Sequence, residues 1–106
     1  MSGMETLCYE LLGSRRPAPF APVLVGVVAS GNLEVLVEST DSDRCILRID
    51  TSARGFGTIW EAVVRDFHGR HRLAGVALTI HDMGATPAIV SLRLEQAAAQ
   101  LEEGRA

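Results

Sequence analysis

Ser30 is the residue whose type and surroundings best suit chemistry in this chain. It follows an apolar run at residues 23–28 and precedes Gly31-Asn32, after which residues 33–37 alternate between apolar and other side chains. Gly followed by Asn between two such runs predicts a two-residue hairpin turn, because both residues tolerate positive φ. This turn makes Ser30 the last residue of the first strand and places it opposite Leu33. We therefore expect an accessible hydroxyl at a hairpin tip, beside a residue without a side chain.

A hydrolase nucleophile is a poor interpretation of Ser30. Residues 28–32 read Val-Ala-Ser-Gly-Asn and join two strands, whereas the Gly-x-Ser-x-Gly elbow joins a strand to a helix. No His base can be assigned to this serine from sequence. We expect no catalytic residue in this chain, and a hairpin serine without a function remains an alternative.

The histidines give weak signals. His68 and His71 have the spacing of a ligand pair, but no Cys or carboxylate follows at a matching spacing. Three nearby arginines, at positions 65, 70 and 72, would repel a cation. The sequence predicts no metal site, and it indicates a solvated basic loop over residues 68–72 that could alternatively meet an anion such as phosphate.

His81 and Asp82 are a second candidate pair. Adjacent residues on a strand point to opposite faces, so the two side chains should not act together. Their position before Gly84 predicts the end of a strand and a turn.

The composition limits the class of protein. A chain of 106 residues is one domain, which we place at residues 1–106 with frayed ends at 1–3 and 104–106. A net charge of −3 and only 5% aromatic residues argue against nucleic acid as a partner, because phosphate binding needs a basic surface. No apolar run is long enough to cross a membrane.

The cysteines suggest the compartment. Cys8 and Cys45 each fall in a strand-like apolar pattern, where a free thiol usually acts as a small buried hydrophobic group. A reducing, cytoplasmic location fits two such thiols best. Export through the twin-arginine route is the alternative that Arg15-Arg16 suggests, but three prolines interrupt the following segment.

Periodicity predicts the elements that must position Ser30. Strands are expected at residues 6–12, on both sides of the hairpin turn, at 45–50 and at 76–81. Thr58 should cap a helix through a capping box with Glu61, and Gly69 should end that helix. A second helix should follow the N-cap Thr86. Its residues 89–94 also alternate like a strand, but Pro87 and the Ala-rich continuation to residue 103 favour helix.

These elements indicate an α+β fold. We expect a two-layer sandwich in which a four- to five-stranded, mostly antiparallel sheet with a central β-hairpin carries two helices on one face. The third strand, the first helix and the fourth strand could form a crossover, which would make the sheet mixed.

Two stretches resemble a known family. Residues 26–36 (Gly-Val-Val-Ala-Ser-Gly-Asn-Leu-Glu-Val-Leu) resemble the hairpin of the acyl carrier protein, or delta subunit, of malonate decarboxylase. Residues 80–87 (Ile-His-Asp-Met-Gly-Ala-Thr-Pro), continuing through Leu92-Arg93-Leu94-Glu95-Gln96, resemble its C-terminal segment. The acyl carrier (gamma) subunit of citrate lyase is a more distant relative. Ala29 stands where the family commonly has Gly, and Asn32 where it commonly has Asp.

The resemblance implies a specific function. Ser30 would carry 2′-(5″-phosphoribosyl)-3′-dephospho-CoA through a phosphodiester, with Gly31 and Asn32 forming the turn beside it. The thiol of this arm would hold acetyl or malonyl in the cytoplasm. The implied partners are the transferase (alpha) subunit, the decarboxylase (beta and gamma) subunits and a prosthetic-group transferase. The Asp-Ser-Leu signature of ordinary 4′-phosphopantetheine carriers is absent at a helix start. A regulatory or interaction module without a covalent arm remains the alternative.

Overall fold

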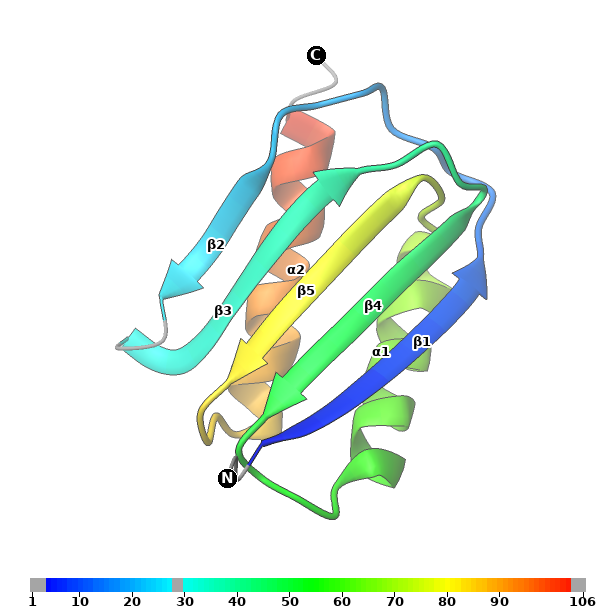
Figure 1. Ribbon diagram of the computed structural model, residues 1–106. Helices are drawn as coiled ribbons and strands as arrows, with labels where there is room; N and C mark the ends of the chain where they lie inside the picture. Colours follow the sequence, from blue (N-terminus) through cyan, green and yellow to red (C-terminus); the bar gives the residue numbers. More distant parts are fainter. Residues whose placement is uncertain (1–3, 28–29, 104–106) are drawn as a thin grey trace.

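A five-stranded sheet covered on one face by two helices forms the molecule (Figure 1). The computed structural model describes residues 4–27 and 30–103, and only the backbone of residues 27, 30–32, 102 and 103. In chain order the elements are β1 (Glu5–Leu12), β2 (Val23–Val27), β3 (Ser30–Ser39), β4 (Arg44–Thr51), α1 (Gly57–His71), β5 (Val76–Asp82) and α2 (Pro87–Glu103). The α+β class and the two-layer arrangement expected from the sequence are confirmed.

The strand order is β1-β4-β5-β3-β2. β4 and β5 are parallel neighbours joined through α1, and the other three strand pairs are antiparallel. The sheet is therefore mixed, as the predicted crossover required. The β2–β3 hairpin is not central, because β2 forms one edge of the sheet and β5 is the middle strand. The edge position expected for the first strand is confirmed.

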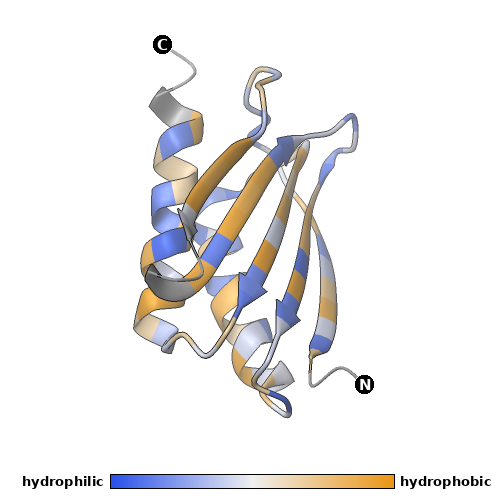
Figure 2. Ribbon diagram, turned by 60° about the vertical axis from the view of Figure 1, so that its left-hand side comes forward, coloured by the Kyte–Doolittle hydropathy of each residue, from blue (hydrophilic) through white to orange (hydrophobic). Residues whose placement is uncertain are grey.

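The core lies between the sheet and the helices. Along β4, the side chains of Cys45, Leu47 and Ile49 are fully buried, which is the face that the alternation predicted. Figure 2 shows apolar and polar residues alternating along the strands. On α1, Trp60 and Phe67 are buried in the stripe that the helical spacing predicted. Each such side chain contributes roughly 1.5–3 kcal/mol by leaving water.

Helix α1 begins and ends differently from the prediction. Phe56 is the N-cap, and no side chain caps the helix. The predicted capping box is wrong because the helix already includes Gly57, so that Thr58 lies within the first turn. At the other end the helix passes Gly69 and stops at Arg72, whose φ of 53° is left-handed. Gly69 is tolerated inside the helix at a cost of about 1 kcal/mol relative to Ala.

Helix α2 agrees with the prediction. Thr86 Oγ1 accepts a hydrogen bond of 3.3 Å from the Ile89 N–H, which is the bond of an N-cap. Val90, Leu94 and Leu101 are buried at helical spacing. Residues 89–94 therefore form part of the helix despite their strand-like alternation.

The two cysteines differ. Cys45 is fully buried, and burial raises the pKa of its thiol to about 12. Cys8 is exposed, which contradicts the expectation of a buried thiol. The reason is its place in β1, where its neighbours Leu7 and Tyr9 take the face that packs on the core. In residues 4–27 and 30–103, no helix is long and apolar enough to cross a membrane.

Candidate functional site: the hairpin end of the sheet

Ser30 is the first residue of β3 and pairs with Val27 of β2. The predicted turn is therefore misplaced: the connection consists of residues 28–29, which lie outside the described residues, while Gly31 and Asn32 belong to β3. The sequence had suggested that Ser30 lies opposite Leu33, but it lies opposite Val27. It still follows the connection directly, at one end of the sheet.

A bulge in the β2–β3 pairing, opposite Gly26, explains the shifted register. Val25 pairs with Val35, but Val27 pairs with Ser30. The two pairs are therefore two residues apart on β2 and five residues apart on β3. Gly26, between the two pairs, has a φ of 73°, a conformation that favours glycine. The additional residues of β3 let the strand curve at this end, as Figure 1 shows.

Arg93 of α2 lies across this bulge. A Cβ atom on Gly26 would come within 2.6 Å of Arg93 Nε and 2.9 Å of the Leu33 carbonyl oxygen. The missing side chain thus makes room for an arginine at the base of the hairpin. Arg93 Nη1 also donates a 3.0 Å hydrogen bond to Gln96 Oε1. Sequence reasoning missed this cation, although an isolated Gly within a strand does signal a close approach by another group.

We call this end of the sheet the hairpin end. It is where β3 begins at Ser30, where β4 and β5 end at Thr51 and Asp82, and where α1 and α2 begin. Asp82 is buried, and its carboxylate connects the end of β4 with the turn that follows β5. Its Oδ2 accepts a hydrogen bond of 2.7 Å from Thr51 Oγ1, and its Oδ1 accepts from the Gly84 and Ala85 N–H groups at 3.2 and 2.8 Å. The predicted strand end and turn are confirmed.

His81 faces the opposite side of the sheet, as predicted. Its Nδ1 lies 3.1 Å from Glu34 Oε1, and its Nε2 lies 3.6 Å from Asp50 Oδ2. Thr6 Oγ1 donates a 2.8 Å hydrogen bond to Asp50 Oδ1, which extends this polar row across four strands. The row places two carboxylates on the open face near the hairpin end.

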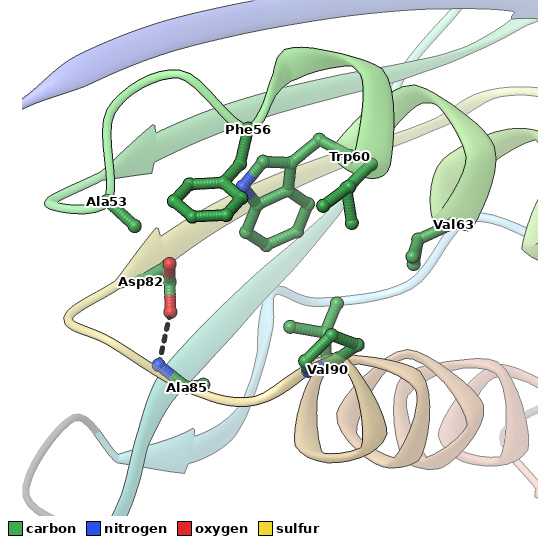
Figure 3. Close-up of a pocket in the computed structure, with 9 residues that line it drawn as sticks. Ala53, Phe56, Trp60, Val63, Asp82, Ala85 and Val90 are labelled. Atoms are coloured by element: carbon green, nitrogen blue, oxygen red, sulfur yellow. Dashed lines mark hydrogen bonds between the residues drawn. The ribbon is translucent and has the colours of Figure 1, made fainter.

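An apolar pocket of about 240 Å³ opens at the same end (Figure 3). It lies between the first turns of the two helices and the end of β5. Figure 3 shows Phe56 and Trp60 on one side, Val90 on the other and Asp82 near the turn. The lining residues are Ala53, Phe56, Ile59, Trp60, Val63, Asp82, Ala85, Pro87 and Val90. Sequence reasoning did not find this pocket, because two stretches far apart in sequence, residues 53–63 and 82–90, form it.

The predicted basic loop at residues 68–72 is wrong. His68 and His71 lie in the last turn of α1, where His68 is buried with Nε2 3.0 Å from the Leu73 carbonyl oxygen. His71 Nε2 lies 2.9 Å from Glu95 Oε1, and Arg70 pairs with Glu95 and Asp66. The imidazoles of His68 and His71 therefore each contact a different oxygen within the protein. Within residues 4–27 and 30–103, no group of three or more His, Cys, Asp or Glu side chains is arranged to hold a metal.

Comparison with known proteins identifies the class. The family model of the malonate decarboxylase delta subunit (MdcD) matches residues 21–101. A malonate decarboxylase acyl carrier protein from Burkholderia cepacia is 64% identical over 100 residues, covering 94% of this chain and 93% of its own. The acyl carrier protein from Stenotrophomonas maltophilia strain K279a is 52% identical over 103 residues, covering 95% and 97%.

A solved structure agrees with these relatives. One chain of a Pseudomonas malonate decarboxylase hetero-tetramer, crystallised with malonate, superimposes with a TM-score of 0.80 at 34% identity. The match covers 92% of this chain and 98% of that one. The relatives define the class as acyl carriers. This chain belongs to the malonate decarboxylase delta subunit family, as the resemblance had implied.

Proposed function

We propose that this chain carries the acyl group of malonate decarboxylase on 2′-(5″-phosphoribosyl)-3′-dephospho-CoA, attached to Ser30 through a phosphodiester. The observation that supports this most is the backbone position of Ser30, directly after a two-residue connection at the end of the sheet. A group attached there starts at the end of the sheet and not along its length.

The surroundings fit a phosphodiester. Arg93 lies across Gly26, next to the Val27–Ser30 pair, and so places a guanidinium at the base of the hairpin. A guanidinium forms charge-assisted hydrogen bonds with phosphate oxygens. The acidic row of Glu34 and Asp50 lies on the open face of the sheet, opposite the face that carries α2.

The division of labour follows from the chemistry. When bound, the arm supplies a thiol that holds acetyl or malonyl as a thioester, which can delocalise the carbanion left when CO₂ departs. In this proposal the chain itself is not a catalyst, and its role is to tether and to dock. The transferase (alpha) subunit would exchange acetyl for malonyl, and the decarboxylase (beta and gamma) subunits would remove CO₂. Tethering raises the effective concentration of substrate at each of these sites.

Intact mass and peptide mapping test the attachment. Protein from its native host should carry the added mass of the arm on the peptide that contains Ser30. Ser52 is the matched control, because it is exposed and also lies at the hairpin end. Ser30→Ala should leave the protein unmodified, and Ser52→Ala should be modified like the parent. Modification of Ser30→Ala would refute the site, and its complete absence from native protein would favour the regulatory-module alternative.

A further inference from the structure

The pocket at the hairpin end suits an uncharged ligand. Eight of its nine lining residues are apolar, and the exception, Asp82, already accepts three hydrogen bonds. Phe56 and Ile59 lie at the rim with 46% and 47% of their surfaces exposed. Such a pocket rewards the burial of apolar atoms, and Asp82, its one charged side chain, is itself acidic.

Ser30 lies within reach of this pocket. Asp82 lines it and pairs with Leu33, three residues after Ser30 on β3. Three residues of strand span about 10 Å, and paired strands lie about 5 Å apart, so the Cα atoms of Ser30 and Asp82 are at most about 15 Å apart. The pantetheine part of the arm alone extends about 15 Å, at the roughly 3.4 Å that three chain bonds cover. The remainder of the arm adds further length.

The volume matches the end of the arm. At about 30 Å³ for each water-sized group, 240 Å³ accommodates on the order of eight heavy atoms. An acetyl thioester with its adjoining ethylamine segment has about this many atoms. From these features we propose that the pocket shelters the acetyl thioester end of the arm while the carrier is between active sites. This inference rests on the proposed function.

The same pocket should reject malonyl. The extra carboxylate of a malonyl thioester would be buried among apolar side chains and close to the Asp82 carboxylate. An unpaired charge in such a place costs desolvation energy and meets like-charge repulsion. Exchange of acetyl for malonyl would therefore release the arm from the pocket and leave the malonyl end exposed for the next subunit.

Trp60 provides a direct measurement. It is the only tryptophan in the chain, and it lines the pocket. The isolated carrier is prepared in apo, acetyl and malonyl forms, and Trp60 emission is measured with acrylamide as quencher. The acetyl form should show less quenching than the apo form, and the malonyl form should resemble the apo form. Equal quenching of apo and acetyl forms, or equal protection by malonyl, would overturn the proposal.

A matched pair of substitutions tests the location. Ala53→Leu fills the pocket from the loop before α1, whereas Ala88→Leu adds the same atoms at an exposed position of α2 outside it. Ala53→Leu should remove the protection of Trp60 by acetyl, and Ala88→Leu should retain it. Protection that survives in a folded Ala53→Leu carrier refutes the assignment. The acetyl–malonyl comparison on the unsubstituted chain decides the question without any variant.

Free ligands separate this proposal from the attachment at Ser30. A tether provides an effective concentration of about millimolar. If the tethered acetyl end is mostly sheltered, free S-acetylpantetheine should perturb Trp60 of the apo carrier with half-saturation at or below that concentration. S-malonylpantetheine should not. A carrier whose mass shows the arm on Ser30, but whose Trp60 responds to neither form, overturns the pocket alone. A Trp60 response in a chain that never carries the arm overturns the proposed function alone.

Discussion

The two ends of the sheet differ in how tightly their loops pack. At the far end, where β1 and β3 finish and β4 and β5 begin, backbone hydrogen bonds join separate segments: Ser14 N–H to Arg72 O at 2.9 Å and Gly75 N–H to Arg44 O at 3.0 Å. A Cβ atom on Gly13 would lie 1.8 Å from the Leu73 carbonyl oxygen. At the hairpin end, the loop glycines Gly55 and Gly84 have nothing within 4 Å of such an atom, although Gly26 in β2 is closely packed.

The two ends of the sheet therefore have different structural roles. The far end fixes the register and the path of the long connection from β1 to β2, because its backbone groups bond to one another. The hairpin end leaves a pocket and exposes apolar side chains such as Phe56, Ile59 and Met83. Leu12 at the far end is exposed as well, so the two ends differ in the packing of their loops and not in whether they expose apolar side chains.

The largest expected effect is functional and falls at the hairpin end. Ser30→Ala should abolish malonate turnover by the reconstituted complex, because no other group would carry the acyl chain. Its free energy of unfolding should change by no more than about 0.5 kcal/mol, since only one oxygen atom is removed. Turnover is measured beside circular dichroism, with Ser52→Ala as control. A folded Ser30→Ala carrier that supports full turnover would contradict the carrier role.

The next largest effect is structural and falls at the far end. Gly13→Ala should lower the free energy of unfolding by about 3 kcal/mol, because the new methyl group would overlap a backbone carbonyl that cannot move independently. Gly55→Ala should cost only about 1 kcal/mol, from its φ of +87°. Urea denaturation of both variants measures the difference. Equal costs would mean that the two ends do not differ in packing.

Cys45, near the start of β4, makes the packed end sensitive to alkaline pH. Burial raises the pKa of its thiol from 9.0 to about 12, so the folded state holds this proton more tightly than the unfolded state does. The resulting stability is complete below pH 9 and is lost as the pH rises towards 12. A decrease on the order of 2 kcal/mol is expected between pH 9 and pH 11. Urea denaturation of the parent and of Cys45→Val at several pH values measures how much of the pH-dependent loss of stability comes from the thiol. An identical pH dependence in that variant would remove this explanation.

The smallest effect compares the two helix starts at the hairpin end. Thr86→Ala should lower stability by about 1 kcal/mol, because it removes the N-cap bond to the Ile89 N–H. Thr58→Ala should be close to neutral, since Thr58 makes no cap bond in α1. Thermal unfolding of the two variants provides the test. A substantial loss in Thr58→Ala would restore the capping box that the sequence suggested.

Periodicity predicted the fold because burial follows directly from it. The alternation in β4 and the helical spacing of Val90, Leu94 and Leu101 identified the core-facing sides without reference to distant residues. The hairpin register failed for the opposite reason. At Gly26 the chain approaches Arg93, which lies far away in sequence, and the turn propensity of residues 31–32 carries no information about such a contact.

The candidate site was predicted in part. The sequence pattern and the resemblance indicated Ser30, and its role stays a prediction. The pocket could not be predicted, because it needs the relative placement of α1, α2 and the turn after β5. The burial of Cys8 was also misjudged. Its apolar neighbourhood suggested the core, but Leu7 and Tyr9 take the core face, so strand alternation places Cys8 on the open face.

The Gly26 bulge also affects how molecules of this protein avoid one another. β2 is an edge strand of the sequence Val-Leu-Val-Gly-Val, and such a strand could add to the sheet of a second molecule. The bulge limits its regular pairing to Val23–Val25, Pro22 precedes it, and Arg93 brings a charged side chain to the break. A strand that is interrupted after three residues is a poor template for self-association. The same glycine that shapes the hairpin thus protects the protein against aggregation.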